Sequence, residues 1–421
     1  MIPALLLFLA AYGGMLLLPR YRAAIVLTVG ALFVVSGQLS WREALAAVDW
    51  NVLLMMAGTM GMVHLFVQSR MPARLAELLL RRVRTVRGAA VALALLAGGI
   101  SALVDNVATV LMVAPVALAV CRRLEVNPAP MVIAIAVSSN LQGAATLVGD
   151  TTAVMLGSAM DMRFTDFFRY HGRPSIFFAV ELGALTSAAV LAWLFRREKR
   201  PVPRDERQTE VTDWVPTVLL GATLALLVGA SFLPWRIPMC NGLICCGALA
   251  VGMADRWRKK RTLAALLEPV RAMDFQTLGV LLGLFVVIGG LSRRGVIDGA
   301  AQLLARVGGS GFRLYSLVVW GSAAISAFVD NIPYVAAMIP VIGGLAGSLG
   351  IDPTALYFGL LSGATLGGNC TPVGASANIA ALGLLEREGR RVPVKEFLRV
   401  GIPFTLAALL PAYGYIWLVY G

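Results

Sequence analysis

The chain has 421 residues, of which 58% are hydrophobic and 14% are charged. This excess of apolar residues excludes a soluble globular protein and indicates a polytopic membrane protein. The formal net charge of +13 does not indicate a nucleic-acid partner, because the basic residues stand in short segments between apolar runs, as the positive-inside rule predicts. We therefore expect an all-α, multi-pass protein of the cell membrane, or of the cytoplasmic membrane in a bacterium, with lipid around it.

Seven apolar runs reach or approach the length of a helix that crosses a bilayer. The first run, residues 2–18, lacks a basic leader and a small-residue cleavage site, so we expect it to be retained as a span. It leads to Arg20 and Arg22, which we expect in a cytoplasmic loop. The other six runs are residues 23–35, 52–67, 175–194, 215–232, 278–291 and 404–418.

An internal repeat divides the chain into two halves. The sequence SALVDNVATVLMVAPV at 101–116 recurs in the second half as SAFVDNIPYVAAMIPV at 326–341. We infer a duplication in which each copy places one carboxylate, Asp105 or Asp330, in an apolar stretch. The same offset, without a gap, relates Asp49 to Asp274, Gly58 to Gly283, Gly143 to Gly368, Thr146 to Thr371, Val148 to Val373 and Gly149 to Gly374.

The two halves are predicted to be residues 1–195 and 213–421, joined by a cytoplasmic linker at 196–212 that holds basic residues and prolines. In the first half, basic residues flank the apolar segment 88–120 on both sides, which places both flanks in the cytoplasm. A segment that enters and leaves on one side of the membrane is a re-entrant hairpin. Asp105 would then lie near the tip of this hairpin.

Residues 131–158 are too polar at their centre for one continuous span, because Gly143 and a run of threonine, glycine and aspartate interrupt them. We predict a broken helix there. The repeat predicts a second hairpin at 314–342 and a second broken helix at 354–383. Each half then has five transmembrane helices, one of them broken, and one hairpin. Because five is an odd number, the second half is predicted to be inverted relative to the first.

Inverted repeats bring hairpin tips and broken helices together near the bilayer midplane. An ionised side chain at that depth costs at least ~3 kcal/mol, so two carboxylates require water, cations or protons. Carboxylate, amide, hydroxyl and free carbonyl oxygens are hard ligands that suit sodium, and a desolvated carboxylate can take up a proton. We expect one cavity to collect Asp105, Asn106, Asn140, Thr146, Asp330, Asn331, Asn369, Thr371, Ser376 and Asn378.

Simpler interpretations of these residues stay open. An Asp-Asn pair at a helix break can serve only to cap the half-helix that follows, although its recurrence at Asp105 and Asp330 favours a functional role. Asp150 has Ala375 as its repeat partner, so both capping and proton coupling are considered for it. No cofactor is expected besides the coupling ion, because the five cysteines show no metal-ligand spacing.

Four stretches carry a resemblance that covers nearly the whole chain. They are SALVDNVATVLMVAP from Ser101, SNLQGAATLVGDTTAVMLGS from Ser139, SAFVDNIPYVAAMIP from Ser326 and GATLGGNCTPVGASANIA from Gly363. These stretches resemble the ion transporter superfamily, in particular its arsenite permease and sodium/proton antiporter branch, which is P protein-like. That branch is related to the citrate transporter-like and divalent anion/sodium symporter families.

The resemblance implies two sodium sites, and a homodimer whose transport domain moves like an elevator past a fixed scaffold. The first site would combine Ser101, Asp105 and Asn106 with the break at Gly143, and the second Ser326, Asp330 and Asn331 with the break at Gly368. Dicarboxylate-transporting relatives carry Ser-Asn-Thr at the tip, whereas here Asp replaces Ser, and Val107 and Ile332 replace Thr. Two carboxylates would repel a carboxylate substrate unless cations or protons screened them.

The leading hypothesis is a secondary transporter, not an enzyme, that is coupled to sodium or protons and carries a small inorganic ion or small molecule. We favour cation/proton antiport over export of arsenite or another inorganic oxyanion and over sodium-coupled carboxylate symport. A channel is a further alternative, but paired broken helices favour alternating access. An intramembrane aspartyl protease also uses two membrane aspartates; its Gly-x-Gly-Asp signature is absent, because Leu147 stands where the first glycine would be.

Overall fold

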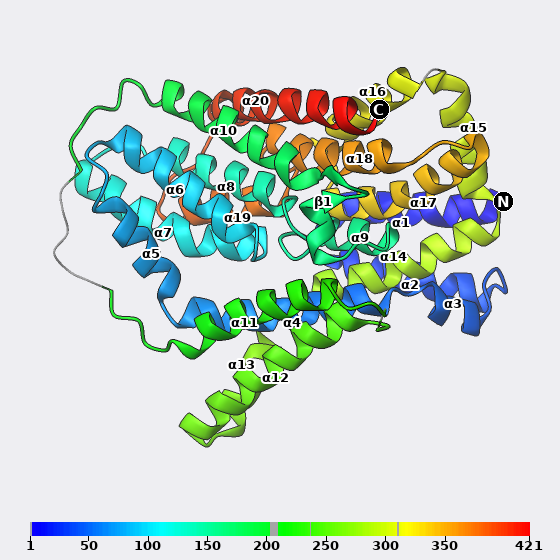
Figure 1. Cartoon of the computed structure of the whole chain (residues 1–421), viewed down its shortest axis with the longest axis horizontal. Coiled ribbons are helices and arrows are strands. Elements are labelled where there is room, and N and C mark those ends of the chain that lie inside the picture. The colour runs from blue at the N-terminus through cyan, green and yellow to red at the C-terminus, as the bar shows by residue number, and fades with distance from the viewer. Residues whose placement is uncertain (1, 203–208, 236, 310) are drawn as a thin grey trace.

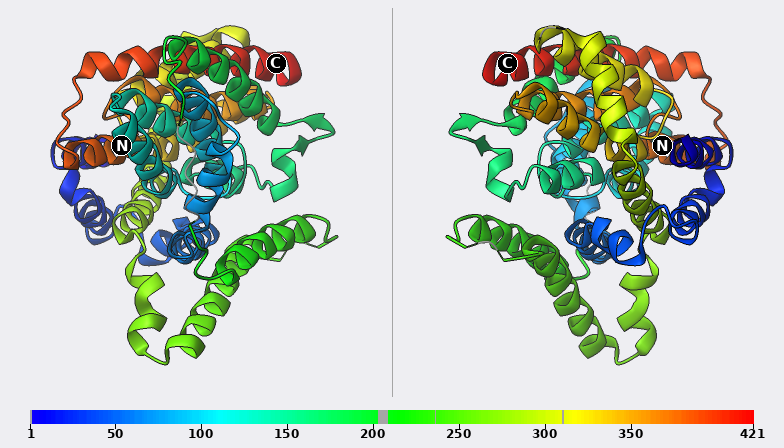
Figure 2. Two further views of the ribbon diagram at one scale, coloured as in Figure 1. Left: turned by 90° about the vertical axis from the view of Figure 1, so that its left-hand side faces the viewer. Right: turned by 90° about the vertical axis from the view of Figure 1, so that its right-hand side faces the viewer.

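A computed structural model describes residues 2–202, 209–235, 237–309 and 311–421, and these residues form an almost entirely helical bundle (Figure 1). Six of the described helices are long and apolar enough to cross a membrane, and α1 with α2 would make a seventh span if the pair counts as one. The expected all-α polytopic architecture is thus confirmed. The end of α12 and the short helix α13 project from one side of the bundle (Figures 1 and 2).

The first half contains ten α-helices. They are α1 (Ile2–Leu17), α2 (Arg22–Val35), α3 (Trp41–Ala47), α4 (Trp50–Gln68), α5 (Met71–Leu80), α6 (Val86–Ser101), α7 (Asn106–Leu124), α8 (Ala129–Gly143), α9 (Thr151–Ala159) and α10 (Ile176–Leu194). Between α9 and α10 the chain forms the 3-10 turn η2 (Phe164–Phe167) and a two-stranded antiparallel hairpin of β1 (Arg169–Tyr170) and β2 (Arg173–Pro174).

The second half also contains ten α-helices and one 3-10 turn. They are α11 (Val215–Ser231), α12 (Cys240–Lys260), α13 (Leu263–Arg271), α14 (Phe275–Arg293), α15 (Val296–Gly308), α16 (Gly311–Ser326), α17 (Asn331–Leu349), α18 (Thr354–Gly367), η3 (Gly368–Cys370), α19 (Ser376–Arg387) and α20 (Val394–Tyr420). Of the predicted linker 196–212, residues 203–208 lie outside the described residues. Its end packs near α4 and α5, where the backbone N–H of Thr209 donates to Glu77 (2.8 Å).

The sequence repeat is also a repeat of helices. Helices α4 to α9 correspond in order to helices α14 to α19. In each pair the two first residues are separated by the same offset that separates Asp105 from Asp330. The starts coincide because capping residues are duplicated. The Asp49 and Asp274 carboxylates accept hydrogen bonds from the backbone N–H of Val52 and Thr277, both at 3.1 Å, and so begin α4 and α14 in the same way. The opposite orientation of the two copies stays a prediction.

Two pairs of helices meet at the breaks where the hairpins are predicted. The helix ends at Ser101 and resumes at Asn106 in the first copy, and it ends at Ser326 and resumes at Asn331 in the second. The second helix of each pair, α7 or α17, has 19 residues and is long enough to cross a membrane by itself. The predicted broken helices are likewise interrupted, between α8 and α9 and between α18 and α19.

The start of the chain differs from the two separate spans expected at 2–18 and 23–35. Helices α1 and α2 have only 16 and 14 residues, and they bend by 119° about the turn η1 (Pro19–Tyr21). Pro19 favours the break because its ring has no N–H to continue the helix. The bend carries Arg22 into contact with Asp330. Arg22 was expected in a loop, but it is the first residue of α2.

The core lies around α8 and α18, the first parts of the two broken helices. All 14 residues of α18 are buried, and α18 packs along α16 through small residues. A Cβ atom at Gly363 would lie 2.4 Å from the backbone oxygen of Val319, and one at Gly367 would lie 2.3 Å from that of Ala323. Such close contact between helix backbones is typical of membrane proteins. It fixes the second helix break against the second tip.

Candidate functional site

Each helix break places its aspartate at the start of the following helix. The Asp105 carboxylate accepts hydrogen bonds from the backbone N–H groups of Val107 (3.0 Å) and Ala108 (3.2 Å). Asp330 accepts one from Ile332 (3.3 Å). Both aspartates therefore do cap their helices, as the simpler interpretation expected. Capping does not account for everything, because each carboxylate also faces a cavity.

Buried hydroxyl and amide groups fix the first tip. The Ser101 hydroxyl donates to the Asn106 side-chain oxygen (2.6 Å), and the Ser139 hydroxyl reaches Ser101 (3.0 Å) and the Asn106 backbone oxygen (3.1 Å). The Thr146 hydroxyl donates to the backbone oxygen of Ala102. These bonds join α6, α7 and the α8–α9 break into one unit. The structure thus brings Ser101, Asn106 and Thr146 together at the first tip, and their role in ion binding stays a prediction.

The second tip is fixed in a related way. The Ser326 hydroxyl donates to the backbone oxygen of Ala364 (2.6 Å), and the Thr371 hydroxyl donates to that of Ala327. Asn331 is buried, with 5% of its surface exposed. The Thr371 bond is the repeat counterpart of the Thr146 bond, because donor and acceptor are shifted by the same offset. The two tips therefore share the hydrogen bond that ties the broken helix to the tip backbone.

Backbone oxygens converge at the glycine that ends each break. At Gly149 the position that a Cβ atom would take lies 2.6 Å from the Gly143 oxygen and 2.9 Å from the Ser101 oxygen. At Gly374 the equivalent position lies 2.6 Å from the Gly368 oxygen and 2.8 Å from the Ser326 oxygen. Ala102 and Ala327 each add a third backbone oxygen, at 3.1 and 2.8 Å. These close contacts leave no room for a Cβ atom, which explains why glycine stands at both positions, and they place backbone oxygens, which are hard ligands for small cations, beside each tip.

Three asparagines connect the two broken helices at the centre of the bundle. The Asn140 side-chain amide donates to Asn369 (2.7 Å) and Asn378 (3.1 Å). Asn369 donates onward to the Val137 backbone oxygen (3.0 Å), and Asn378 to that of Gly368 (2.9 Å). Asn369 and Asn378 were predicted as cavity ligands. Their amides instead hold α8, η3 and α19 together, while Asn140 also lines a cavity.

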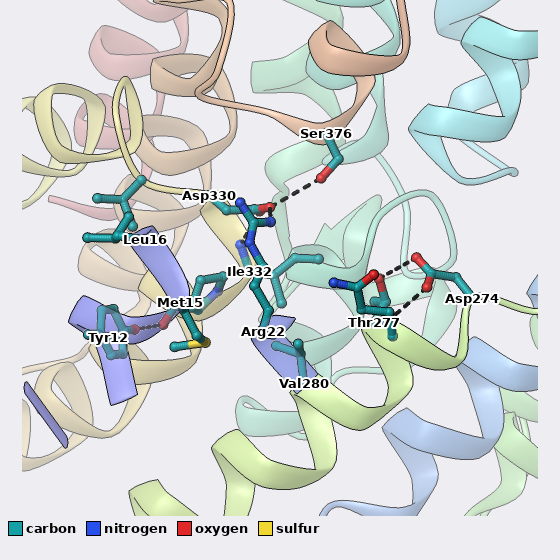
Figure 3. Close-up of a pocket in the computed structure, with 13 residues that line it drawn as sticks. Tyr12, Met15, Leu16, Arg22, Asp274, Thr277, Val280, Asp330, Ile332 and Ser376 are labelled. Atoms are coloured by element: carbon teal, nitrogen blue, oxygen red, sulfur yellow. Dashed lines mark hydrogen bonds and ion pairs between the residues drawn. The ribbon is translucent and has the colours of Figure 1, made fainter. Parts of the chain in front are cut away.

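Two cavities adjoin the tips. The first cavity, of about 330 Å³, is lined by the carboxylates of Asp105, Asp150 and Asp274. The second cavity, of about 180 Å³, is lined by Asp330 and also by Asp274 (Figure 3). Four residues line both cavities, namely Asp274, Thr277, Ile332 and Ser376. The other polar residues of the first cavity are His64, Asn106, Asn140, Thr151 and Asn331.

Asp150 lies in the first cavity beside the first tip. Only 6% of its surface is exposed, and its carboxylate accepts a hydrogen bond from the Thr152 hydroxyl (2.6 Å). Burial of a carboxylate requires such hydrogen bonds, a counter-ion or a proton. The first cavity therefore concentrates negative charge around Asp105 and Asp150.

Asp330 has a different environment, because an arginine contacts it. The Arg22 guanidinium lies 2.9 Å from the Asp330 carboxylate, which also accepts a hydrogen bond from the Ser376 hydroxyl (3.2 Å), as Figure 3 shows. The Tyr12 hydroxyl donates to the backbone oxygen of Pro333 in the same cavity. Sequence reasoning missed Arg22, Tyr12 and Asp274 as site residues. The only signal was the repeat that relates Asp274 to Asp49.

Carboxylates that line cavities at paired helix breaks, within a bundle of membrane-spanning helices, are typical of membrane transporters. The family model for citrate transporters matches residues 7–265 and 245–421, and the chain belongs to this citrate transporter family. It is therefore a secondary transporter in the cell membrane and crosses the membrane several times. The family also confirms the resemblance to the ion transporter superfamily.

Several known proteins are similar over most of the chain. A protein of Mycobacterium tuberculosis, described as an uncharacterized transporter, is 30% identical over 432 residues, which cover 99% of this chain and 98% of that protein. The P protein of Homo sapiens is 26% identical over 457 residues, 90% of this chain and 54% of the P protein. The YdaH transporter of Alcanivorax borkumensis has the same fold, with a TM-score of 0.62 over 92% of this chain and 87% of YdaH at 16% identity.

Proposed function

We propose that this secondary transporter exchanges a small cation for protons, with Asp105 as the coupling carboxylate. The supporting observation is the first cavity, which Asp105 and Asp150 line together, near the backbone oxygens that converge at Gly149. Among the described residues, Asp105 accepts hydrogen bonds from backbone N–H groups and forms no ion pair with a basic side chain. A half-buried carboxylate within a membrane-spanning bundle that has no counter-ion needs a mobile cation or a proton.

The proposed cycle uses each group for one task. A sodium ion, if it is the coupling cation, would be held by backbone oxygens of Ser101, Ala102 and Gly143 and neutralised by Asp105. When the cation leaves, a proton takes its place on the carboxylate, because a bare buried charge is the costliest state. Asp150 lines the same cavity, and we assign it the exchange of that proton. Proton and cation binding thereby exclude one another, which is the requirement for antiport.

The remaining features of the proposal rest on the family resemblance. We propose that the protein is a homodimer and that the tips and broken helices move together past a scaffold, so that the cavities open alternately to the two sides. The substrate is proposed to be a small cation or a protonated neutral species. Two carboxylates in the first cavity would repel a multiply charged anion, and a low dielectric strengthens that repulsion.

Citrate-like carboxylate symport is the second candidate, and two observations favour it. The matching family is described by citrate transport, and Arg22 brings a positive charge to the second cavity. Guanidinium groups bind carboxylates in bidentate fashion. Against this candidate, Arg22 is already paired with Asp330, and Asp274 adds a second carboxylate to the lining of that cavity.

Flux measurements in proteoliposomes separate these candidates. Purified protein would be reconstituted with a pH-sensitive dye inside, and sodium, lithium, arsenite, citrate or succinate would be added outside under an imposed pH gradient. Antiport predicts that sodium or lithium drives proton movement and that citrate does not. Sodium-driven uptake of citrate or succinate without proton movement would contradict the proposal and support symport. Movement of arsenite alone would support oxyanion export.

A further inference from the structure

The two acidic tips are not equivalent, because among the described residues only the second carries an internal counter-ion. The Arg22 guanidinium lies 2.9 Å from the Asp330 carboxylate. The pair is largely shielded from solvent, with 27% of the Arg22 side chain and 10% of the Asp330 side chain exposed. The two residues are separated by 308 positions in the chain, so the pair is a product of the tertiary fold.

Several contacts hold Arg22 in this position. Helix α2 begins at Arg22, directly after the 119° bend, and packs along α14. The Gln276 side chain at the start of α14 donates to the Pro19 backbone oxygen in the bend (3.0 Å). On the other side, Tyr12 of α1 donates to Pro333 at the second tip. The bend therefore clamps the second tip and delivers the guanidinium to its carboxylate (Figure 3).

The duplication supplies no such arginine to the first tip. Helix α12 packs on α4 as α2 packs on α14, and Gly58 and Gly283 contact Cys245 and Val26 in the same way. These contacts relate Arg22 to Asn241, which carries no charge. The titratable groups that line the first cavity with Asp105 are Asp150, Asp274 and His64. Those that surround Asp330 are Arg22, Tyr12 and Asp274 in the second cavity, with Tyr334 near Tyr12. Within the described part of the chain, only the second tip thus has a permanently charged cation within reach.

We propose that the Arg22 guanidinium is a tethered cation that occupies the second acidic site, so that mobile cations or protons bind only at the first. Arg22 would then determine how many ions move in each cycle, and it would do so by satisfying Asp330 from within the protein. Arginine suits this task because it stays protonated under all ordinary conditions. The effect of Arg22 on transport rests on the proposed function. Whether Arg22 keeps Asp330 from taking up a proton can be measured without a transport assay.

Site-resolved labelling with a hydrophobic carbodiimide tests the proposal. The reagent modifies carboxyl groups that are protonated in an apolar environment, so a carboxylate paired with a guanidinium should react slowly. Purified protein would be treated at pH 6 in sodium-free choline buffer, and the modified fraction at Asp105 and at Asp330 would be read by peptide mass spectrometry. In the unaltered protein we expect Asp105 to be modified about tenfold faster than Asp330, or more.

Three variants sharpen this measurement. Arg22→Gln should raise modification of Asp330 to about the level of Asp105, which would be roughly a tenfold gain. Arg22→Lys keeps a positive charge and should keep Asp330 protected. Arg20→Gln is the matched control, because it removes an equal charge from the same bend, where Arg20 is exposed. It should leave both rates unchanged.

Two results at Asp330 would overturn the tethered-cation proposal. One is equal modification of Asp105 and Asp330 in the unaltered protein, and this comparison decides the matter even if Arg22→Gln does not fold. The other is an Asp330 that stays protected in folded Arg22→Gln. Absence of modification at Asp105 in sodium-free buffer would also count against it, because the first site would then not take a proton. A protein that shows the expected labelling but no sodium-driven proton movement would refute the proposed antiport alone.

Discussion

The two helix tips began as copies and now differ in how they neutralise their carboxylates. At both tips an aspartate caps the following helix, a threonine bonds across the break and backbone oxygens converge on a glycine. At the second tip Arg22 compensates Asp330, whereas the first tip gathers Asp105 and Asp150 around a larger cavity. Duplication thus preserved the backbone geometry, while Arg22, which lies outside the gap-free repeat, makes the charge at the two tips different.

The two tips are predicted to enter the membrane from opposite sides. Cysteine labelling tests this orientation directly, because each introduced cysteine is accessible from one side only. Single cysteines beside Arg84 and Arg123 flank the first hairpin, and cysteines beside Arg313 and Ile351 flank the second. In a background without native cysteines, we expect the first two to be modified by an impermeant reagent from one side and the last two from the other. If Arg84 and Arg123 were reached from opposite sides, the hairpin and the inverted repeat would both be wrong.

Glycine substitutions test the backbone oxygens of each tip. Gly149→Ala should abolish sodium-dependent proton movement, because its methyl group would lie 2.6 Å from the Gly143 oxygen. Gly374→Ala makes an equally close contact with Gly368, so we expect a similar loss of thermal stability. It should leave more of the sodium dependence than Gly149→Ala does. Gly99→Ala in α6 is the control, since no atom lies within 4 Å of its added methyl group. Equal sodium dependence in both tip variants would contradict the assignment.

Asp150 provides a smaller effect within the first cavity. Asp150→Asn removes one of two neighbouring carboxylates, so we expect proton movement to fall by about tenfold and to change its pH dependence. Thr152→Val removes only the hydroxyl that donates to Asp150 (2.6 Å), a bond worth about 1 kcal/mol. Its effect on flux should be correspondingly weaker. A larger loss in Thr152→Val than in Asp150→Asn would show that the threonine acts independently of the carboxylate.

The smallest effect is expected at the charged cluster next to the first cavity. Glu268 of α13 accepts a hydrogen bond from Gln68 and lies 3.3 Å from Arg256 and 3.7 Å from His64, which lines that cavity. The hydrogen bond from Gln68, followed by the nearby Arg256, lowers the pKa of the Glu268 carboxyl below its usual value. The ionised Glu268 carboxylate therefore stabilises the folded protein fully above the unfolded-state pKa of about 4.3. This stabilisation is lost as the pH falls through the lower folded-state pKa.

Thermal denaturation in detergent between pH 6 and pH 3.5 measures this contribution. Because 38% of the Glu268 side chain is exposed, we expect Glu268→Gln to cost no more than about 1 kcal/mol at pH 6. The cost should shrink toward pH 3.5. Glu386→Gln serves as the control, since Glu386 pairs with the exposed Arg391 at the protein surface. A cost that grows with acidity would contradict the assigned direction.

The sequence predicted the architecture well wherever polar residues interrupt apolar runs. The breaks at Asp105, Asp330 and Gly143 were found because a charge or glycine in a membrane segment is costly and stands out. The repeat then located the second copy of each element. The family comparison confirms the superfamily resemblance, and the helical bundle confirms the all-α class.

The sequence could not predict contacts between distant segments. Arg22 stands beside Arg20 in a short basic segment, which is the pattern of an ordinary cytoplasmic loop, and nothing local marks its partner Asp330. Asn369 and Asn378 were expected to face a cavity, but they bond to Asn140 in the other half of the chain. Such pairings follow from how the two broken helices cross, and a single sequence holds no record of that geometry.

The most direct test of the central claim compares the two tips in one flux assay. Asp105→Asn, Arg22→Gln/Asp330→Asn and the unaltered protein would be reconstituted at equal density, and proton movement driven by a sodium gradient would be recorded. We predict a loss of about 100-fold in Asp105→Asn and of less than about tenfold in the double variant, whose two missing charges compensate one another. An equal or greater loss in the double variant would show that the second tip also carries a mobile ion, and would contradict the account.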